Sequence, residues 1–194
     1  YNTSYFGDTI LTDALCRNLK RLYPESRLVF VSNKPFTDIS RYMDGVDEVW
    51  TYDKWGVHKG LAGWYKFYKE HKNQYVFDAA FVIYGNERGI LLSKFLGAKK
   101  IYADNRHAIV RLLLSNGKIN YGKWIHVQDR HAYLAELYAG KPMESMKIRY
   151  HVPDEAFAYI NEQLLKGISK PIIALNPVTK RKEKDLKPDT LLTL

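Results

Sequence analysis

The stretch FDAAFVIYG, residues 77–85, predicts a buried β-strand, because apolar side chains run through it almost without interruption. The next stretch, ERGILLSKFLG at 87–97, predicts a helix that ends at its final glycine. KKIYA at 99–103 then predicts a second strand. A strand, a helix and a strand in such quick succession are typical of a parallel sheet covered by helices.

The same alternation continues on both sides of this unit. Leucine recurs every three or four residues between Leu11 and Leu22, which predicts a helix over 8–23 that Pro24 ends. Further strands are expected at 27–33 and 47–53, and a further helix at 129–139. We therefore expect the α/β fold class, with a doubly wound, Rossmann-like parallel sheet.

The amino-terminal end leaves little room for the first strand of such a sheet. A doubly wound domain usually begins with a strand that runs into a turn containing glycine. Only Tyr1 to Phe6 precede Gly7, so we expect the first strand to be largely missing or very short.

The pattern is interrupted near the stretch IRYHVPDEAF, which suggests a domain boundary. We expect residues 1–152 to form one domain, followed by a hinge helix and linker over 153–170. The helix itself is expected at 154–166, and the stretch PIIALNP at 171–177 predicts a strand. Residues 171–194 would then be the start of a second domain that is cut off.

The composition is that of an ordinary folded protein, with 46% hydrophobic and 26% charged residues among 194. No apolar run approaches the ~20 residues that are needed to cross a bilayer. The single cysteine, Cys16, rules out an internal disulfide and favours a reducing compartment. The formal net charge of +9 attracts anions, so nucleic acid, an acidic membrane surface and phosphorylated small molecules are all candidate partners.

Gly7-Asp8 stands directly at the start of the first predicted helix. An aspartate there accepts hydrogen bonds from free backbone N–H groups and complements the helix dipole, so Asp8 could be a cap alone. The same place is the carboxyl end of the first strand, where doubly wound folds bind their ligands. A carboxylate there could also take a proton from a bound hydroxyl.

Four stretches, taken in order, resemble the bacterial heptosyltransferases of glycosyltransferase family 9. The opening GDTILTDALCRNLKRLYPESRLVFVS is similar to the family's Gly-Asp, leucine-rich helix, Tyr-Pro and strand. FDAAFVIYGNERGILLSKFLGAKKIYADNR resembles its strand, turn, arginine, helix and Gly-Ala-basic strand. A helix start of the family is similar to the stretch HVQDRHAYLAELYAG. The opening of its nucleotide-binding domain is similar to the stretch PIIALNPVTKRKEKDLKP.

The resemblance implies a GT-B fold, in which two doubly wound domains face each other across a cleft. This chain would be the amino-terminal, acceptor-binding domain with the start of the donor domain. The implied reaction is the inverting transfer of a heptose, or a related sugar, from an ADP-sugar to a lipopolysaccharide core acceptor. Asp8 would be the catalytic general base, removing the proton from the acceptor hydroxyl.

The resemblance also implies donor-phosphate-binding residues in the basic loop at 180–184. The family places a basic residue shortly before a proline here, which indicates Lys184 first and Lys182 next, with Thr179 preceding them. Such side chains can hold a diphosphate and neutralise its charge as it leaves. Without the resemblance, a solvated charged segment would be the favoured interpretation of this loop.

The segment 53–75 mixes lysine with tryptophan and tyrosine. A helix in this segment would place four aromatic rings on one face, where they could pack against the sheet. These residues are Trp64, Phe67, Tyr68 and His71. The lysines at 66, 69 and 72 would point elsewhere.

In family 9 this region is basic and contacts the phosphorylated lipid acceptor. The resemblance therefore implies acceptor-binding roles for Lys54, His58 and Lys59. Arg88, at the start of the helix at 87–97, is a further acceptor-binding candidate that could instead form a surface ion pair with Glu87. Mixtures of lysine and aromatic residues also suit a membrane interface.

Motifs of other chemistries are not found in the sequence. It lacks a phosphate loop ending in Gly-Lys-Ser/Thr, a Gly-x-Gly-x-x-Gly fingerprint and a Gly-x-Ser-x-Gly elbow. His126 and His131 are five residues apart, which does not place them on one helix face, and no cysteine pair accompanies them. We expect no metal site and no cofactor besides the sugar-nucleotide donor, ADP-heptose by the resemblance.

The resemblance implies two partners, a nucleotide-sugar donor and a phosphorylated, lipid-linked oligosaccharide acceptor. The protein would lie in the cytoplasm, peripheral at the cytoplasmic face of the inner membrane. Nucleic acid is not expected, because the basic residues are scattered over several elements.

The alternative functions are a transferase with another nucleotide-sugar and glycan acceptor, a non-catalytic anion- or nucleic-acid-binding module, and a non-catalytic relative. Alone, the chain is expected to be inactive, since most of the donor site lies outside it.

Overall fold

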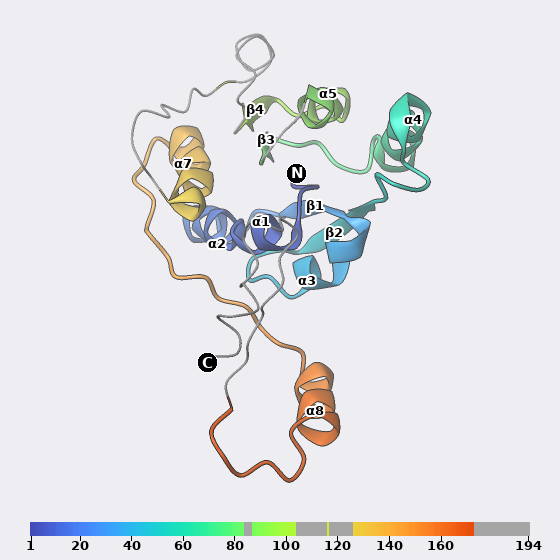
Figure 1. Cartoon of the computed structure of the whole chain (residues 1–194). Coiled ribbons are helices and arrows are strands. Elements are labelled where there is room, and N and C mark those ends of the chain that lie inside the picture. The colour runs from blue at the N-terminus through green and yellow to red at the C-terminus, as the bar shows by residue number, and fades with distance from the viewer. Residues whose placement is uncertain (84–86, 104–115, 117–125, 173–194) are drawn as a thin grey trace, which may run out of the picture. The chain divides into compact units, whose positions relative to one another are not determined.

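The structure is a computed structural model that describes residues 1–83, 87–103, 116 and 126–172 (Figure 1). The chain divides into two compact units, Tyr1–Pro153 and Asp154–Leu194. In the second unit, α8 spans Asp154–Gln163 and is three residues shorter than the helix expected there. Of the strand expected at 171–177, only the first two residues are described, and they have no regular structure.

The first unit contains two pairs of parallel strands among its described residues. These strands are β1 (Val29–Asn33), β2 (Glu48–Tyr52), β3 (Ala79–Val82) and β4 (Lys100–Ala103). β1 pairs with β2 so that Val29 lies opposite Glu48, and β3 pairs with β4 so that Ala79 lies opposite Lys100. The predicted strands of this unit are confirmed, and each is shorter than the stretch that indicated it, by one residue for β4 and by more for the others.

Helices connect and flank these strands. They are α1 (Phe6–Ile10), α2 (Asp13–Leu22), the 3-10 turn Lys34–Phe36, α3 (Thr37–Arg41), α4 (Gly60–His71), α5 (Glu87–Phe95) and α7 (Val127–Ala139). The helix predicted over 8–23 is therefore divided in two. At the division, Asn2 Nδ2 donates to both the main-chain oxygen of Asp8 (3.0 Å) and Thr12 Oγ1 (2.9 Å). This tertiary contact explains the break, which the leucine periodicity alone did not indicate.

One face of the strands is covered by α2 and α7. Leu15 and Leu19 of α2 and Leu134 of α7 pack against Ile83 and Tyr102. This layer buries the leucines whose spacing predicted α2, because they recur on a single side of the helix.

The other face is covered by α4 and α5. Phe67 of α4 and Leu92 of α5 pack against Val31, Trp50 and Tyr52. In Figure 1, α4 and α5 lie on the opposite side of the strands from α2 and α3. Helices on both faces of parallel strands confirm the doubly wound α/β fold.

Tyr1 and Asn2 lie between the two strand pairs and connect them. The Tyr1 ammonium donates to the main-chain oxygen of Phe81 (2.7 Å), and the N–H of Ile83 donates to the oxygen of Tyr1 (2.9 Å). On the other side, Asn2 N–H donates to Val31 oxygen (3.0 Å), and Asn2 forms a parallel bridge with Ser32. Two residues thus stand where a central strand would run, between β1 and β3.

The buried Tyr1 ammonium makes stability depend on pH in a chain that begins at Tyr1. Burial lowers the pKa of this ammonium from 8.0 to about 6. The unfolded chain therefore binds more protons than the folded chain between pH 6 and pH 8, so the free energy of unfolding should rise across this window. The rise is up to about 3 kcal/mol. Urea denaturation at pH 5.5, 7 and 8.5 would measure it.

Acetylation of the Tyr1 amine provides the control for this prediction. The acetylated chain keeps an N–H that can donate to Phe81 but carries no charge, so the part of the pH dependence between pH 6 and 8 should disappear. His71, whose pKa burial also lowers, titrates in both forms and cancels in the comparison. Equal pH profiles for the free and acetylated chains would contradict the prediction.

Candidate active site

The carboxyl ends of the parallel strands carry most of the candidate residues that the structure describes. Asn2 leads into the turn before α1, and the helix α1 contains Asp8. Asn33 ends β1, and Asp53 and Lys54 directly follow β2. Since the strands are parallel, these residues gather at one edge of the sheet, which is where doubly wound folds bind ligands.

Asp8 is half-buried in α1 and is held in place through its main chain. Its main-chain oxygen accepts hydrogen bonds from Asn2 Nδ2 and Thr12 Oγ1, both at 3.0 Å. Its carboxylate accepts a hydrogen bond from Tyr5 N–H at 3.4 Å, a length typical of a weak bond. This geometry suits a helix cap, and it also leaves the carboxylate at the surface, where a ligand hydroxyl could reach it.

Lys54 brings a positive charge to the turn that precedes Asp8. Its Nζ donates to the main-chain oxygen of Thr3 at 2.6 Å. The same ammonium lies 4.5 Å from the ring centroid of Trp55 and 5.5 Å from that of Tyr5, both cation–π distances. Among the residues predicted to bind the acceptor substrate, Lys54 is thus the one whose described contacts link it directly to the turn before Asp8.

His58 is only 5% exposed and has protein partners at both ring nitrogens. Nδ1 accepts from Asp53 N–H (2.9 Å), so the ring proton is on Nε2, which faces the Glu70 carboxylate at 3.0 Å. A Cβ at Gly63 would collide with the main chain of His58, so glycine allows α4 to pack closely there. These contacts show that His58 shapes the loop between β2 and α4, while its acceptor role stays a prediction.

The other two predicted acceptor residues lie at helix starts. Lys59 is exposed directly before α4. Arg88 is exposed in the first turn of α5, where its main-chain oxygen accepts a hydrogen bond from Trp64 Nε1 (3.1 Å). Burial raises the pKa of the Tyr1 phenol to about 12. The nearby Arg88 guanidinium has a smaller, opposite effect on this pKa.

Asn33 is a candidate that the sequence analysis missed. It is fully buried at the end of β1, and neither its amide nitrogen nor its amide oxygen has a hydrogen-bond partner among the described residues. An amide in that state costs free energy unless water or a ligand satisfies it. The signal in the sequence was a polar residue at the carboxyl end of an otherwise apolar strand.

Asp53, at the end of β2, is held by a neighbouring loop. Lys34 Nζ binds its carboxylate at 2.9 Å, and this hydrogen bond lowers the pKa of Asp53. Gly56 N–H donates to the same carboxylate at 2.9 Å and closes the turn that follows β2. Asp53 is therefore engaged in local structure beside the candidate site.

Several predicted residues lie outside the described part of the chain. They are the donor-phosphate-binding candidates Lys184, Lys182 and Thr179. His126 caps α7 by accepting a hydrogen bond from Gln128 N–H (3.3 Å). Across the described ranges, no cluster of three or more His, Cys, Asp or Glu side chains could hold a metal ion. No described helix has the length and hydropathy to span a membrane.

Comparison with solved structures finds this fold in glycosyltransferases. A structure of a glycosyl transferase family 9 protein from Veillonella parvula is similar with a TM-score of 0.72 at 19% identity. The match covers 85% of this chain and 49% of that one. The fold class is therefore shown: this is an α/β unit of the kind found in GT-B glycosyltransferases.

Two heptosyltransferase structures from E. coli are similar as well. Heptosyltransferase WaaC with ADP matches with a TM-score of 0.68 at 18% identity, over 94% of this chain and 58% of that one. ADP-heptose lps heptosyltransferase II matches with a TM-score of 0.64 at 17% identity, over 88% and 51%. The chain thus spans about half the length of these structures. No family model and no curated protein matches the sequence.

Proposed function

We propose that this chain is the acceptor-binding half of an inverting glycosyltransferase. The enzyme transfers a heptose, or a related sugar, from an ADP-sugar to a phosphorylated lipopolysaccharide core acceptor. Asp8 is the general base that takes the proton from the acceptor hydroxyl as its oxygen attacks the anomeric carbon. The nucleoside diphosphate leaves, and the configuration at that carbon inverts.

The observation that carries this proposal is the position of Asp8. Its carboxylate is partly exposed at the edge of the sheet where doubly wound folds bind ligands, and its main chain is anchored by Asn2 and Thr12. A general base needs both properties, because it must reach the hydroxyl and must keep its direction while the proton moves. The fold shared with two heptosyltransferase structures, one of them with ADP, supports the donor class.

Lys54 supports an anionic acceptor on this side of the site. Its ammonium lies beside the turn that leads to Asp8, where it can pair with a phosphate on the acceptor. Lys59 and Arg88 extend this positive charge, and the buried His58 holds the loop that presents Lys54. In the same proposal Lys184, Lys182 and Thr179 contact the donor diphosphate.

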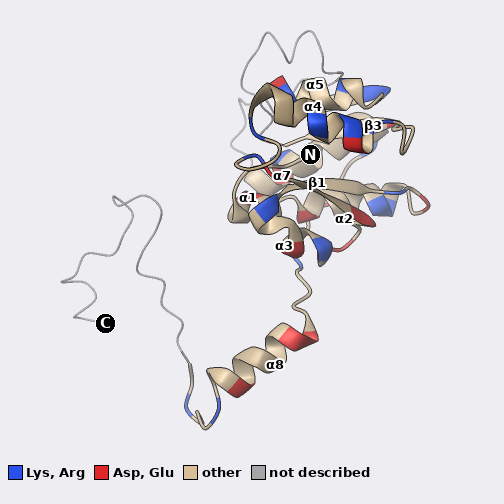
Figure 2. Cartoon of the chain, turned by 90° about the vertical axis from the view of Figure 1, so that its right-hand side faces the viewer, with Lys and Arg blue, Asp and Glu red and all other residues tan. Residues whose placement is uncertain are grey.

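A membrane surface is the expected location of a lipid-linked acceptor. Exposed apolar side chains lie in and beside the loop that carries Lys54, among them Trp55, Val57, Leu61 and Tyr65. Lysines next to such residues suit the headgroup region of an anionic membrane. Figure 2 shows lysine and arginine spread over several elements, which favours this proposal over a continuous nucleic-acid-binding stripe. We propose a peripheral position at the cytoplasmic face of the inner membrane, without a metal or a further cofactor.

The direct test is an activity assay of a longer protein that contains this chain and a donor domain. ADP release is measured with ADP-heptose and a heptose-deficient lipopolysaccharide core, with another ADP-sugar and a UDP-sugar as competing donors. ADP release that requires both substrates supports the proposal. Turnover with only a different nucleotide-sugar would contradict the donor, and turnover by the 194-residue chain alone would contradict the two-domain arrangement.

Replacing Lys54 by alanine should weaken acceptor binding in that assay. The variant Lys54→Ala is expected to raise KM for a phosphorylated acceptor about tenfold, because one charge-assisted contact contributes about 1.5 kcal/mol. The KM for the donor should change little. The control is Lys99→Ala, since Lys99 pairs with Asp78 at the opposite edge of the sheet (2.7 Å). An equal rise in acceptor KM for both variants would mean that only net charge matters.

A further inference from the structure

Side chains of β1 alternate between the two faces of the sheet, which places Asn33. Val31 belongs to the cluster with Phe67 of α4, whereas the Ser40 hydroxyl, in α3, donates to the hydroxyl of Ser32 (2.8 Å). Asn33 keeps an extended backbone (φ −69°, ψ 138°), so its side chain lies on the face of α4 and α5. It is fully buried there, and its amide has no partner among the described residues.

Two hydroxyl groups lie beside Asn33 on the same face. Thr3 runs next to Asn33, because the residues that precede them form a parallel bridge. The Thr3 hydroxyl donates to the phenol oxygen of Tyr1 (3.3 Å). The Tyr1 ring contacts the ring of Tyr52, the residue opposite Asn33 in β2 (6.2 Å between centroids). Asn33, Thr3 and Tyr1 thus form a polar cluster at the carboxyl end of the sheet.

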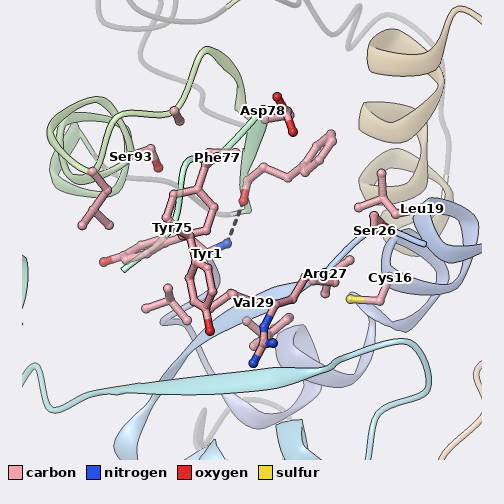
Figure 3. Close-up of a pocket in the computed structure, with 18 of the residues that line it drawn as sticks. Tyr1, Cys16, Leu19, Ser26, Arg27, Val29, Tyr75, Phe77, Asp78 and Ser93 are labelled. Atoms are coloured by element: carbon pink, nitrogen blue, oxygen red, sulfur yellow. Dashed lines mark hydrogen bonds between the residues drawn. The ribbon is translucent and has the colours of Figure 1, made fainter. Parts of the chain in front are cut away.

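The polar cluster is distinct from the cavity that lies between β1 and β3 (Figure 3). That cavity has a volume of about 480 Å³, and most of the side chains that line it are apolar. Tyr1 borders both, but Asn33 and Thr3 are not among the described residues that line the cavity. The unpartnered amide of Asn33 therefore belongs to the edge of the sheet where the candidate active site lies.

Two basic acceptor-binding candidates stand on either side of the polar cluster. Lys54 follows β2 and reaches the main-chain oxygen of Thr3 (2.6 Å), so its side chain crosses the end of β1. On the other side, a Cβ at Gly89 would collide with the Tyr1 ring, which shows that the start of α5 packs closely against this ring. Arg88, the residue before Gly89, is therefore near the cluster as well.

The proposed base lies one turn of chain away from the polar cluster. Tyr5 N–H donates to the Asp8 carboxylate (3.4 Å), and the Lys54 ammonium is 5.5 Å from the centroid of the Tyr5 ring. Phe36, in the turn that follows β1, contacts Phe6 of α1 at 6.4 Å between ring centroids. A sugar with one hydroxyl at Asp8 would therefore have neighbouring hydroxyls near the end of β1.

The two unpartnered atoms of the Asn33 amide define the chemistry of a ligand. Nδ2 donates hydrogen bonds and Oδ1 accepts them, so the ligand must both accept and donate. Sugar hydroxyls do both, whereas a phosphate dianion or a carboxylate only accepts. An amide that is buried without partners costs free energy, which a ligand that pairs with it recovers on binding.

Building on the function proposed above, we propose that Asn33 binds hydroxyls of the acceptor sugar, beside the hydroxyl that Asp8 deprotonates. Lys54 covers this position while it is bonded to Thr3. The acceptor phosphate attracts the Lys54 ammonium away from the Thr3 oxygen, and the sugar then reaches the amide. Asn33 thereby determines specificity, because an acceptor without a hydroxyl at this place leaves the amide unpaired.

The experiment measures binding to the longer protein of the activity assay, so its result does not depend on turnover. Calorimetry gives the Kd of a heptose-deficient lipopolysaccharide core oligosaccharide and of deoxy analogues that each lack one hydroxyl of the acceptor sugar. Asn33→Leu removes the amide at similar volume. The matched control is Thr37→Val, because the Thr37 hydroxyl is also buried without a described partner but begins α3, on the opposite face. The melting temperature of each variant is measured as well.

Asn33→Leu is expected to weaken binding of the core oligosaccharide by about tenfold or more. Its melting temperature should stay the same or rise, because leucine leaves no buried polar group unpaired. One deoxy analogue should bind the wild type about tenfold more weakly than the core does, yet bind Asn33→Leu as well as the core does. Such coupling between residue and hydroxyl indicates a direct contact. Thr37→Val should bind the core like the wild type.

Equal weakening in Asn33→Leu and Thr37→Val would overturn the proposal, and so would deoxy effects that are the same in the wild type and in Asn33→Leu. A melting temperature lower by about 4 °C or more, with unchanged binding, would mean that a buried water satisfies the amide in a structural role. If Asn33→Leu does not fold, the side-chain amide signal of Asn33 in NMR spectra of the wild type decides. It should shift when the oligosaccharide is added, and an unchanged signal would contradict the contact.

Failure of the transferase proposal gives a different result. Core binding that only Asn33→Leu weakens, without any turnover, would support the sugar contact and contradict the reaction. Turnover with unchanged core binding in Asn33→Leu would contradict the sugar contact alone. No binding of the core oligosaccharide to the wild type would contradict both.

Discussion

Replacing Asp8 by asparagine in the complete transferase is expected to lower kcat by about 10²–10⁴-fold, the usual contribution of general base catalysis. Asparagine keeps the size of the side chain and an oxygen that can accept the hydrogen bond from Tyr5, so the local structure should persist. What it loses is the ability to take a proton from the acceptor hydroxyl. Donor binding, measured by calorimetry with ADP, should be unchanged in Asp8→Asn.

The control for this prediction is a carboxylate at the opposite edge of the same sheet. Asp78 directly precedes β3 and forms an exposed ion pair with Lys99, of a kind that contributes little to stability. Asp78→Asn should therefore retain nearly full activity. Wild-type turnover in Asp8→Asn would remove Asp8 as the base, and a lower melting temperature would show that its role is to cap α1.

The Phe67→Ala variant is expected to lower the free energy of unfolding by about 3–5 kcal/mol. Phe67 has no exposed surface, and its ring lies within 4.9 Å of the ring of Tyr52, 5.1 Å of His58 and 4.4 Å of His71, measured between centroids. Truncation would leave a cavity among rigid rings that cannot close around it. Urea denaturation followed by circular dichroism measures the loss.

Leu61→Ala is the matched control on the same helix. The Leu61 side chain is 77% exposed, so its truncation should change the free energy of unfolding by less than about 0.5 kcal/mol. Similar losses in Phe67→Ala and Leu61→Ala would mean that α4 does not pack against the sheet in solution. Because His58 also contacts this cluster, Phe67→Ala should additionally weaken acceptor binding, through the loop that carries Lys54.

The elements of the first unit were predictable because their signals are local. The apolar run at 77–85 and the helix formers at 87–97 were enough to indicate a strand and a crossover helix, and both are present over their described residues. The aromatic face of α4 was predictable for the same reason. Phe67 is buried, Trp64, Tyr68 and His71 are partly buried, and the lysines at 66, 69 and 72 are exposed, as the helical period requires.

The division between α1 and α2 was not predictable from the same kind of signal. The leucine period runs through the break without a proline or glycine to mark it. What interrupts the helix is Asn2, whose amide binds the Asp8 main chain and the Thr12 side chain. Such contacts depend on where the amino terminus lies in the sheet, and local propensity carries no information about that position.

The residues of the candidate site were likewise predictable only in part. Asp8 and Lys54 were indicated by their places in the sequence and by the family resemblance, and their catalytic and acceptor roles stay predictions. The buried state of His58 and the unpartnered amide of Asn33 emerged only from the structure. Both depend on which groups from other elements surround the side chain, and residue type alone does not specify that.

The amino-acid sequence by itself determined the α/β class, the alternation of the main strands and helices, and the apolar faces that pack together, because helical and strand periods are properties of short segments. Only the tertiary structure decided that Tyr1 and Asn2 connect two strand pairs, that Lys54 reaches the turn before Asp8, and that a cavity lies between β1 and β3. The physical reason is that hydrogen bonds and packing between distant segments form only when the whole sheet is assembled.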